Sequence, residues 1–181
     1  MLESSSARNF LSVNNVTANN LYGIFLNSSS SNNVLSGNNV AKNGYGIYLV
    51  LSPNNVLSDN NASANDYGIK LSFSSNNTLS GNNVTANYNG GCYGSCIGGI
   101  MLESSSGNTL SGNVMVGYQY NFEIYGSVLS NFLQSIDTSN LAGGKPVYYF
   151  VNQSNIVVNP DAYPEVGYLG FANCANVTVQ G

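Results

Sequence analysis

Hydrophobic residues along this chain occur in short pieces that return at a nearly fixed interval. The tetrapeptide Gly-Ile-x-Leu begins at residues 23, 46, 68 and 99, with spacings of 23, 22 and 31 residues. Within each piece the apolar positions alternate, as in Ile47-Tyr48-Leu49, which is the period-two pattern of a β-strand. Each piece is too short for a helix, which needs about ten residues. The longest spacing contains the additional letters NGGCYGSC and indicates one repeat with an insertion at residues 89–98.

Asparagine occupies three positions of nearly every repeat. The first position lies two residues before a recurring Leu-Ser pair, the second lies three residues after its leucine, and the third lies five residues further on. The first column is Asn9, Asn33, Asn55, Asn77 and Asn108; the second is Asn14, Asn38, Asn60, Asn82 and Asn113; the third is Asn19, Asn43, Asn65 and Asn87. Such regularity indicates that equivalent residues of successive repeats lie over one another.

These repeats predict an all-β fold, a single-stranded right-handed parallel β-helix. It would be a pectin-lyase-like solenoid of about seven coils, each of about 22–24 residues with three short strands and three corners. The coils would stack about 4.8 Å apart, and the usual hand of parallel crossovers favours the right-handed form. Asparagine suits the columns because its amide both donates and accepts hydrogen bonds, and because it tolerates the left-handed backbone of a tight corner. A leucine-rich repeat is disfavoured, since it needs more leucines and often a helix.

The period is clear only over the first two thirds of the chain. Residues 1–114 are predicted to be regular β-helix coils that carry the insertion. Residues 115–181 are rich in tyrosine and phenylalanine and are interpreted as irregular C-terminal coils and loops of the same solenoid, with a small separate domain as the alternative.

Charge is sparse, at 7% of residues against a usual quarter. The formal net charge of −4 argues against a nucleic-acid partner, because no basic patch is available to neutralise phosphates. No apolar run approaches about 18 residues, so no membrane span is expected in this chain. The opening letters MLESSS return at residue 101. We therefore expect either a piece of a longer protein or end-to-end self-association through the open first coil.

The repeat Gly-Ile-x-Leu-x-x-Ser-x-Asn-Asn-x-Leu-Ser-x-Asn resembles the right-handed parallel β-helix repeats of NosD-like proteins, within the broad class of carbohydrate-binding proteins and sugar hydrolases. The segment SIDTSNLAGGKPVYYFVNQ looks like the tail of archaeal surface proteins that carry such repeats. This resemblance implies an extracellular or cell-surface location, with the export signal outside this chain.

Copper binding also belongs to the description of the NosD family, in nitrous oxide reductase maturation. Soft copper sites need clustered thiolate, thioether or imidazole ligands. The chain has no histidine, and its methionines Met1, Met101 and Met115 fall in different repeats. We therefore expect no metal site and no cofactor.

Paired carboxylates would indicate a sugar-cleaving enzyme, because glycosidases place two of them about 5 to 9.5 Å apart. Glu3 and Glu103 share a column but are separated by four coils, roughly 19 Å at the stacking repeat. Asp59 and Asp66 replace glycines and are interpreted as turn residues. Three more acids fall in predicted C-terminal loops, where a site could be built: Asp137, Asp161 and Glu165. No catalytic residue is assigned.

Aromatic columns are the better candidate for binding. Tyr22, Tyr45 and Tyr67 precede the Gly-Ile step of successive repeats. Phe25 and Tyr48 share an outward-facing position that Lys70 and Met101 continue. Exposed rings can carry sugars, because they combine apolar area with a polar rim. The plainer alternative, which the pattern alone favours, is that the rings only cover neighbouring coils.

The cysteines suggest one covalent link. Cys92 and Cys96 lie in the Gly-rich insertion and would form a disulfide in an oxidising exterior. A reduced pair is the alternative. Cys174 is interpreted as a small buried hydrophobe.

Three functions remain open. The first is a non-catalytic extracellular module, a spacer or an adhesion surface, whose partner is a cell-surface glycan or a neighbouring surface protein. The second is a β-helix enzyme acting on polysaccharides, a lyase, hydrolase or epimerase. The third is copper delivery, by analogy with the resembled family.

Overall fold

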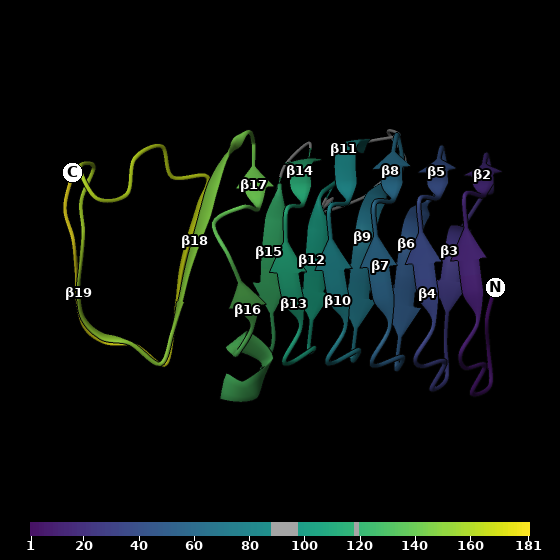
Figure 1. The fold of residues 1–181 in the computed structure, drawn as a ribbon, viewed down its shortest axis with the longest axis horizontal. Helices are drawn as coiled ribbons and strands as arrows, with labels where there is room; N and C mark the ends of the chain where they lie inside the picture. The colour runs from purple at the N-terminus through teal and green to yellow at the C-terminus, as the bar shows by residue number, and fades with distance from the viewer. Residues whose placement is uncertain (88–97, 118–119) are drawn as a thin grey trace.

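The computed structural model describes residues 1–87, 98–117 and 120–181. It confirms the parallel β-helix, with about seven turns. Figure 1 shows the coils side by side along the long axis of the molecule, with the N-terminus at one end. The predicted pair Cys92 and Cys96, and all of the insertion except residue 98, lie outside the described residues.

Three sheets of six, eight and five strands wrap the solenoid, and a fourth sheet has two strands. The first sheet contains β1 (Phe10–Ser12), β4 (Val34–Ser36), β7 (Val56–Ser58), β10 (Thr78–Ser80), β13 (Thr109–Ser111) and β16 (Ser135–Ile136). The second contains β2 (Asn15–Thr17), β5 (Asn39–Ala41), β8 (Asn61–Ser63), β11 (Asn83–Asn87), β14 (Val114–Gly117), β17 (Leu141–Ala142), β18 (Lys145–Val151) and β20 (Tyr168–Ala172). The third contains β3 (Tyr22–Leu26), β6 (Tyr45–Val50), β9 (Tyr67–Ser72), β12 (Ile100–Glu103) and β15 (Phe122–Tyr125). The fourth contains β19 (Ser154–Val158) and β21 (Ala175–Val179).

The described residues contain no α-helix and one 3-10 turn, η1 (Leu129–Phe132). They include no helix long and apolar enough to cross a membrane.

The core consists of columns of aliphatic side chains that stack from coil to coil inside the solenoid. Leu35, Leu57 and Leu79 pair in register on neighbouring strands of the first sheet, and each is 0% exposed. The third sheet adds a second such column that includes Leu49 and Leu71. Because side chains alternate along a strand, the same register that buries these leucines places the residues between them on the outer surface.

Asparagine lines the corners inside the coils. The backbone N–H and the side-chain Nδ2 of Asn38 both donate to Oδ1 of Asn60, at 3.1 and 2.9 Å. Nδ2 of Asn60 in turn donates to Oδ1 of Asn82 and to the carbonyl of Leu35, both at 2.9 Å. Every hydrogen-bonding group of the buried amide is therefore used, and no described buried side-chain nitrogen or oxygen lacks a partner.

The ladders run further than the repeats indicated. Asn140 continues the second column by accepting from Asn113, and Gln134 ends the first column by accepting from Asn108. A fourth column of asparagines is more exposed and is joined only by hydrogen bonds between side-chain amides, with donor–acceptor distances of 2.8 to 3.0 Å. Its members are Asn15, Asn39, Asn61 and Asn83.

The left-handed corners are not formed by the ladder asparagines themselves. At most corners the residue immediately before the ladder asparagine takes the positive φ: Gly37 precedes Asn38, with φ +64°, and Asp59 precedes Asn60, with φ +54°. The ladder asparagine is therefore selected for its amide, and the preceding position for its backbone. This corrects the expectation that tolerance of the left-handed region explains the Asn columns.

The last third of the chain departs from the repeat in one respect. Strands β14 to β17 stack parallel on the preceding coils. After Gly143 and Gly144 the chain reverses, and β18 pairs antiparallel with β17. Strands β20 and β21 then pair parallel with β18 and β19. Figure 1 shows this segment as an open loop at the end opposite the N-terminus. The division of the chain at residue 114 stays a prediction.

Cys174 lies between β20 and β21 and is partly exposed rather than fully buried. Its Sγ lies 3.4 Å from the carbonyl oxygen of Phe150. The corner is less enclosed than expected, because only two layers of strands stack in this part of the fold.

Candidate functional site

The outer face of the third sheet carries the candidate aromatic residues. Ile47 and Leu49 are fully buried in β6, so Tyr48 between them faces outward. Register places Phe25 beside Tyr48 and Tyr48 beside Lys70 on successive coils. A parallel file forms at the start of the same strands, from Tyr22, Tyr45 and Tyr67. These five rings, Tyr22, Phe25, Tyr45, Tyr48 and Tyr67, are called the aromatic strip below.

Rings of the aromatic strip stack within a coil as well as between coils. The ring centroids of Tyr22 and Phe25 are 4.3 Å apart with 10° between the planes. Those of Tyr45 and Tyr48 are 4.8 Å apart at 14°, and those of Tyr45 and Tyr67 are 4.7 Å apart at 7°. All five rings are half-buried.

This stacking changes what the strip offers to a ligand. Parallel rings at these distances cover one another's faces. This is what the plainer alternative expected, in which the rings only cover neighbouring coils. Stacking takes ring faces away from a ligand, whereas the ring edge, which carries the positive part of the aromatic quadrupole, and the hydroxyls of the four tyrosines are not used by the stacking itself. The strip therefore presents hydrogen-bonding groups set in an apolar surface, rather than open ring faces as the sequence suggested.

A cation lies at the end of the strip. The Nζ of Lys70 is 5.7 Å from the ring centroid of Tyr48 and 5.6 Å from that of Tyr67, within the range of a cation–π contact. The same Nζ forms an ion pair with Glu103 of the next coil, at 3.0 Å. Only 14% of the Lys70 side chain and 28% of the Glu103 side chain are exposed, so this pair is more shielded than a typical surface ion pair.

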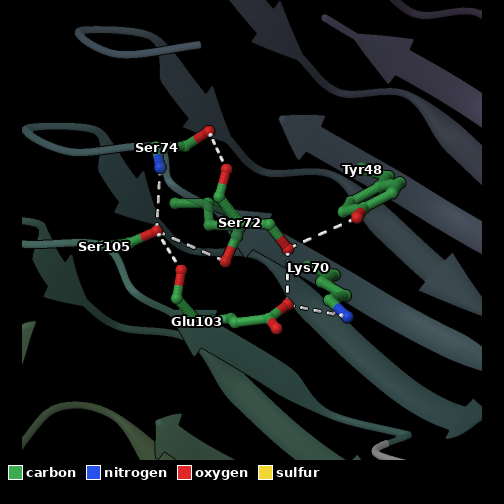
Figure 2. A network of polar contacts seen from close by, with 7 residues as sticks. Tyr48, Lys70, Ser72, Ser74, Glu103 and Ser105 are labelled. Carbon is green, nitrogen blue, oxygen red and sulfur yellow. Dashed lines mark hydrogen bonds and ion pairs between the residues drawn. The ribbon is translucent and has the colours of Figure 1, made fainter. Parts of the chain in front are cut away.

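Hydrogen bonds join this ion pair to the strip, as Figure 2 shows. The hydroxyl of Tyr48 donates to Ser72 Oγ at 3.3 Å. The hydroxyl of Ser72 donates to Glu103 Oε2 at 2.7 Å, the same oxygen that Lys70 contacts. Tyr48, Lys70, Ser72 and Glu103 thus form one connected group, called the polar network below.

Buried serines hold the backbone under the polar network. The Ser74 hydroxyl donates to the carbonyl of Ser72, and the Ser105 hydroxyl donates to the carbonyl of Glu103. The Ser74 backbone N–H donates to Ser105 Oγ at 2.9 Å, which links the two coils. Figure 2 shows both serines to the left of Ser72 and Lys70. The corner after each strand is thereby fixed relative to the next.

The protonation states of the network follow from its contacts. Burial opposes the charge on Lys70, but hydrogen bonding and attraction to Glu103 outweigh burial and raise the pKa of the lysine. Burial likewise opposes the charge on Glu103, but hydrogen bonds from Ser72 and Lys70 outweigh it and lower the pKa of the carboxyl. Burial raises the pKa of Tyr45, so its phenol is a hydrogen-bond donor at neutral pH. At neutral pH both members of the ion pair are charged.

Sequence reasoning placed Tyr48 and Lys70 correctly in one outward column but treated Glu103 only as a distant partner of Glu3. The missed signal is available in the repeats. Aligning GIKLS with GIMLE places Glu103 beside Ser72, and Ser72 lies two residues after Lys70 on the adjacent strand. The observed strand register has the same pairing.

Three of the acidic residues weighed from the sequence lie in other parts of the fold. Glu3 is exposed at the first coil. Asp59 occupies a left-handed corner, as its interpretation as a turn residue requires. Asp137 accepts hydrogen bonds from Ser139 in a C-terminal turn.

The donor set of the described residues does not fit copper. No three His, Cys, Asp or Glu side chains come together in the part of the chain that the structure describes. Met115 is fully buried in the core, whereas Met1 is exposed at the N-terminal end. A thioether cluster is therefore excluded for these two residues.

A polar hollow of about 370 Å³ opens at the corner that precedes the strip. Lys42 and Asp66 both line it, together with Asn19, Asn43 and Gly44. Since Gly44 is followed directly by Tyr45, the hollow adjoins the strip and adds charged groups of both signs.

Comparison with known proteins gives one family and two structural likenesses. The model of the family described as periplasmic copper-binding protein (NosD) matches residues 1–148. Crystal structures of the periplasmic alginate epimerase AlgG and of a point mutant of it resemble the chain with a TM-score of 0.48 each, at 19% and 20% identity. The matches cover 99% and 98% of this chain but 35% of each of those two chains. This likeness carries no information about substrate or activity. No curated protein matches the chain.

Proposed function

Since this chain belongs to the NosD family of β-helix proteins, we propose that it is a non-catalytic module outside the cytoplasm, which binds carbohydrate through the aromatic strip and the polar network. The β-helix is the rigid support, and a glycan or glycosylated surface protein is the partner. The periplasmic location named for the family supports placement outside the cytoplasm. Copper delivery is not part of the proposal, because the described donor groups do not fit the ion.

One observation carries the proposal. Five half-buried rings lie next to a lysine, a serine and a glutamate on one face of one sheet. Sugar sites combine apolar area with a few fixed donors and acceptors, because a pyranose has both apolar C–H groups and hydroxyls. In the strip, tyrosine edges supply the apolar area and Glu103 supplies a fixed acceptor.

A non-catalytic role is supported by the state of Glu103. Glycoside cleavage needs one carboxyl that stays protonated at working pH, which requires a raised pKa. The pKa of Glu103 is lowered instead, and its contacts are Lys70 and Ser72 rather than another carboxylate. We expect no new reducing ends and no unsaturated products from neutral or acidic polysaccharides incubated with the purified chain.

A glycan array tests the proposal directly. The full chain should bind at least one class of glycan, and Tyr48→Ala should lower that binding about tenfold, because the variant removes both a ring of the strip and the hydroxyl that contacts Ser72. Tyr48→Phe separates the two effects, since it keeps the ring. Phe10→Ala is the matched control, because Phe10 is exposed and lies on β1 of the first sheet rather than on the third sheet.

The proposal is rejected if the chain binds no glycan of the array. It is equally rejected if Tyr48→Ala binds as well as the parent chain while its melting curve shows a folded protein. A loss in Phe10→Ala as large as that in Tyr48→Ala would show that the strip is not the site.

A further inference from the structure

We infer that the aromatic strip selects neutral sugars and rejects uronic acids, because its own lysine is already neutralised by a fixed carboxylate. The inference rests on the proposed function, since it assigns a substrate class to the same site. It depends on four features of the described residues: the pairing of Lys70, the charges next to it, the remaining donors and acceptors, and the shielding of the pair.

Lys70 is the cation that lies against the strip. Arg8 and Lys42 lie in corners and Lys145 lies in β18. Uronate recognition normally uses a cation that is free to form a charge-assisted hydrogen bond with the sugar carboxylate. Here that position is filled by Glu103, 3.0 Å from Nζ.

Glu103 is held in place by more than the ion pair. Ser72, itself buried, donates to the same carboxylate oxygen, and the Glu103 carbonyl is fixed by Ser105. An incoming uronate would have to displace this carboxylate from a lysine whose side chain is 14% exposed, or bind beside it. Either route costs free energy, by lost hydrogen bonds or by repulsion between like charges.

The surroundings add negative charge. Along the outward file, Lys70 is followed by Met101 and then by Glu123 on β15. At the opposite corner, Lys42 shares its hollow with Asp66. The whole chain carries a formal net charge of −4. No excess of positive charge therefore compensates for Glu103.

The groups that remain suit hydroxyls. A carboxylate accepts hydrogen bonds, and the tyrosine phenols and the lysine ammonium donate them. A neutral pyranose presents hydroxyls that both donate and accept, so it can use this set without bringing a charge of its own. At a separation of a few ångströms the repulsion between two carboxylates near a protein surface corresponds to about a tenfold preference or more.

Matched oligosaccharides test the inference. The probes are hexasaccharides in pairs, each neutral sugar with a counterpart of the same linkage that differs only by a carboxylate at C6: β-1,4-mannan with β-1,4-mannuronan, α-1,4-galactan with α-1,4-galacturonan and β-1,4-glucan with β-1,4-glucuronan. Binding of the full chain is measured by calorimetry at low and high salt. We expect at least one neutral member to bind about tenfold more tightly than its acidic counterpart, and added salt to reduce the difference through screening.

Glu103→Gln is the decisive variant, because it frees the charge of Lys70 and removes the competing carboxylate. The preference for the neutral member should fall about tenfold or reverse. Glu3→Gln is the matched control: it makes the same change of charge in the same column, roughly 19 Å away at the stacking repeat, and should leave the preference as in the parent chain.

The outcomes separate the two proposals. If no probe binds here and the glycan array is also blank, the proposed function fails. If acidic members bind as well as or better than their neutral counterparts, the site binds glycan but the neutral preference is wrong. If Glu103→Gln, folded by its melting curve, keeps the full preference of the parent chain, the lysine–glutamate pair does not set it and the inference is overturned.

Discussion

At the scale of single residues, each corner of this solenoid divides two tasks between neighbouring positions. The ladder asparagine supplies an amide whose oxygen accepts two hydrogen bonds from the coil before, as Asn60 does from Asn38. The residue in front of it supplies a left-handed backbone, at low cost where that residue is glycine, as at Gly37 and Gly81. Where it is Ala64, with φ +54°, the backbone is strained. The two tasks can be separated by mutation.

Asn60→Ala should destabilise the protein strongly. The change leaves the N–H and Nδ2 groups of Asn38 without the oxygen that accepts from both, and it removes the hydrogen bond from Asn60 Nδ2 to the Leu35 carbonyl, all in a buried position. Each buried unsatisfied group costs about 1–3 kcal/mol, so we expect a loss of about 3 kcal/mol or more in the free energy of unfolding, measured with urea. Asn61→Ala, in the neighbouring and more exposed column, should cost less than about 1 kcal/mol. Equal losses would contradict the assignment of the buried ladders as the stabilising feature.

Ala64→Gly should stabilise the protein by up to about 1 kcal/mol. A left-handed backbone costs a non-glycine residue about 1–2 kcal/mol, and the added flexibility of glycine in the unfolded chain takes back about 0.5–1 kcal/mol. Ala62→Gly, two residues earlier in β8 and fully buried, is the control and should destabilise. A loss of stability in both variants would show that the left-handed corner at Ala64 carries no strain.

At the scale of elements, the third sheet explains why a single face carries the candidate site. Its register stacks Tyr48 beside Lys70 and Ser72 beside Glu103, because each strand starts at the same point of its repeat. The inward residues of the same strands fill the core. A shift of one residue would turn the rings inward, so the buried aliphatic files fix the outward file as well.

The ion pair of this sheet should make stability depend on pH at acidic values. The pKa of Glu103 is lowered in the folded protein, so its contribution is present above the carboxyl's ordinary pKa and is lost as pH falls through the folded value. Glu103→Gln should be less stable than the parent chain at pH 7, and the difference should shrink below about pH 4. Unfolding measured from pH 7 to pH 2 tests this, with Glu3→Gln as the control. A difference that stays constant down to pH 2 would show that the charge of Glu103 is irrelevant to stability.

At the scale of the whole molecule, one two-residue turn decides the shape of the C-terminal third. Gly143 and Gly144 have φ values of +62° and +80°. Two consecutive positive φ angles are what a tight antiparallel hairpin requires, and glycine reaches them without strain. The reversal sends β18 back along β17 instead of into another parallel coil.

Gly144→Val should therefore loosen the C-terminal layers while leaving the regular coils intact. A Cβ at this position meets no heavy atom within 4 Å beyond the two neighbouring residues of the chain, so the backbone conformation is what opposes the change. We expect a loss of about 1–2 kcal/mol or more, seen as faster amide exchange in β18 to β21 than in the parent chain, with β4 to β9 unchanged. Gly144→Asn, which tolerates the left-handed region, should lose much less. Equal effects of Val and Asn would place the constraint outside the turn.

The repeats by themselves determined the stacking of coils, the aliphatic core and the three asparagine columns. They could do so because equivalent positions of a solenoid lie on top of one another, so spacing along the chain translates directly into neighbours in space. The outward file with Tyr48 and Lys70 followed from the same alternation. The hairpin at Gly143 was not foreseen, because a Gly-Gly pair permits a loop as readily as a reversal.

Only the tertiary structure decided what the outward file can do. Spacing placed five rings on one face, and the fold stacks three pairs of them nearly parallel, Tyr22 on Phe25, Tyr45 on Tyr48 and Tyr45 on Tyr67. Spacing also left Glu103 as an isolated acid, whereas the fold brings its carboxylate to Lys70 and Ser72 across neighbouring coils. The physical reason is that a repeat fixes where each Cα lies, while ring tilt and ion pairing depend on side-chain torsions and on partners from adjacent coils, which the period does not specify.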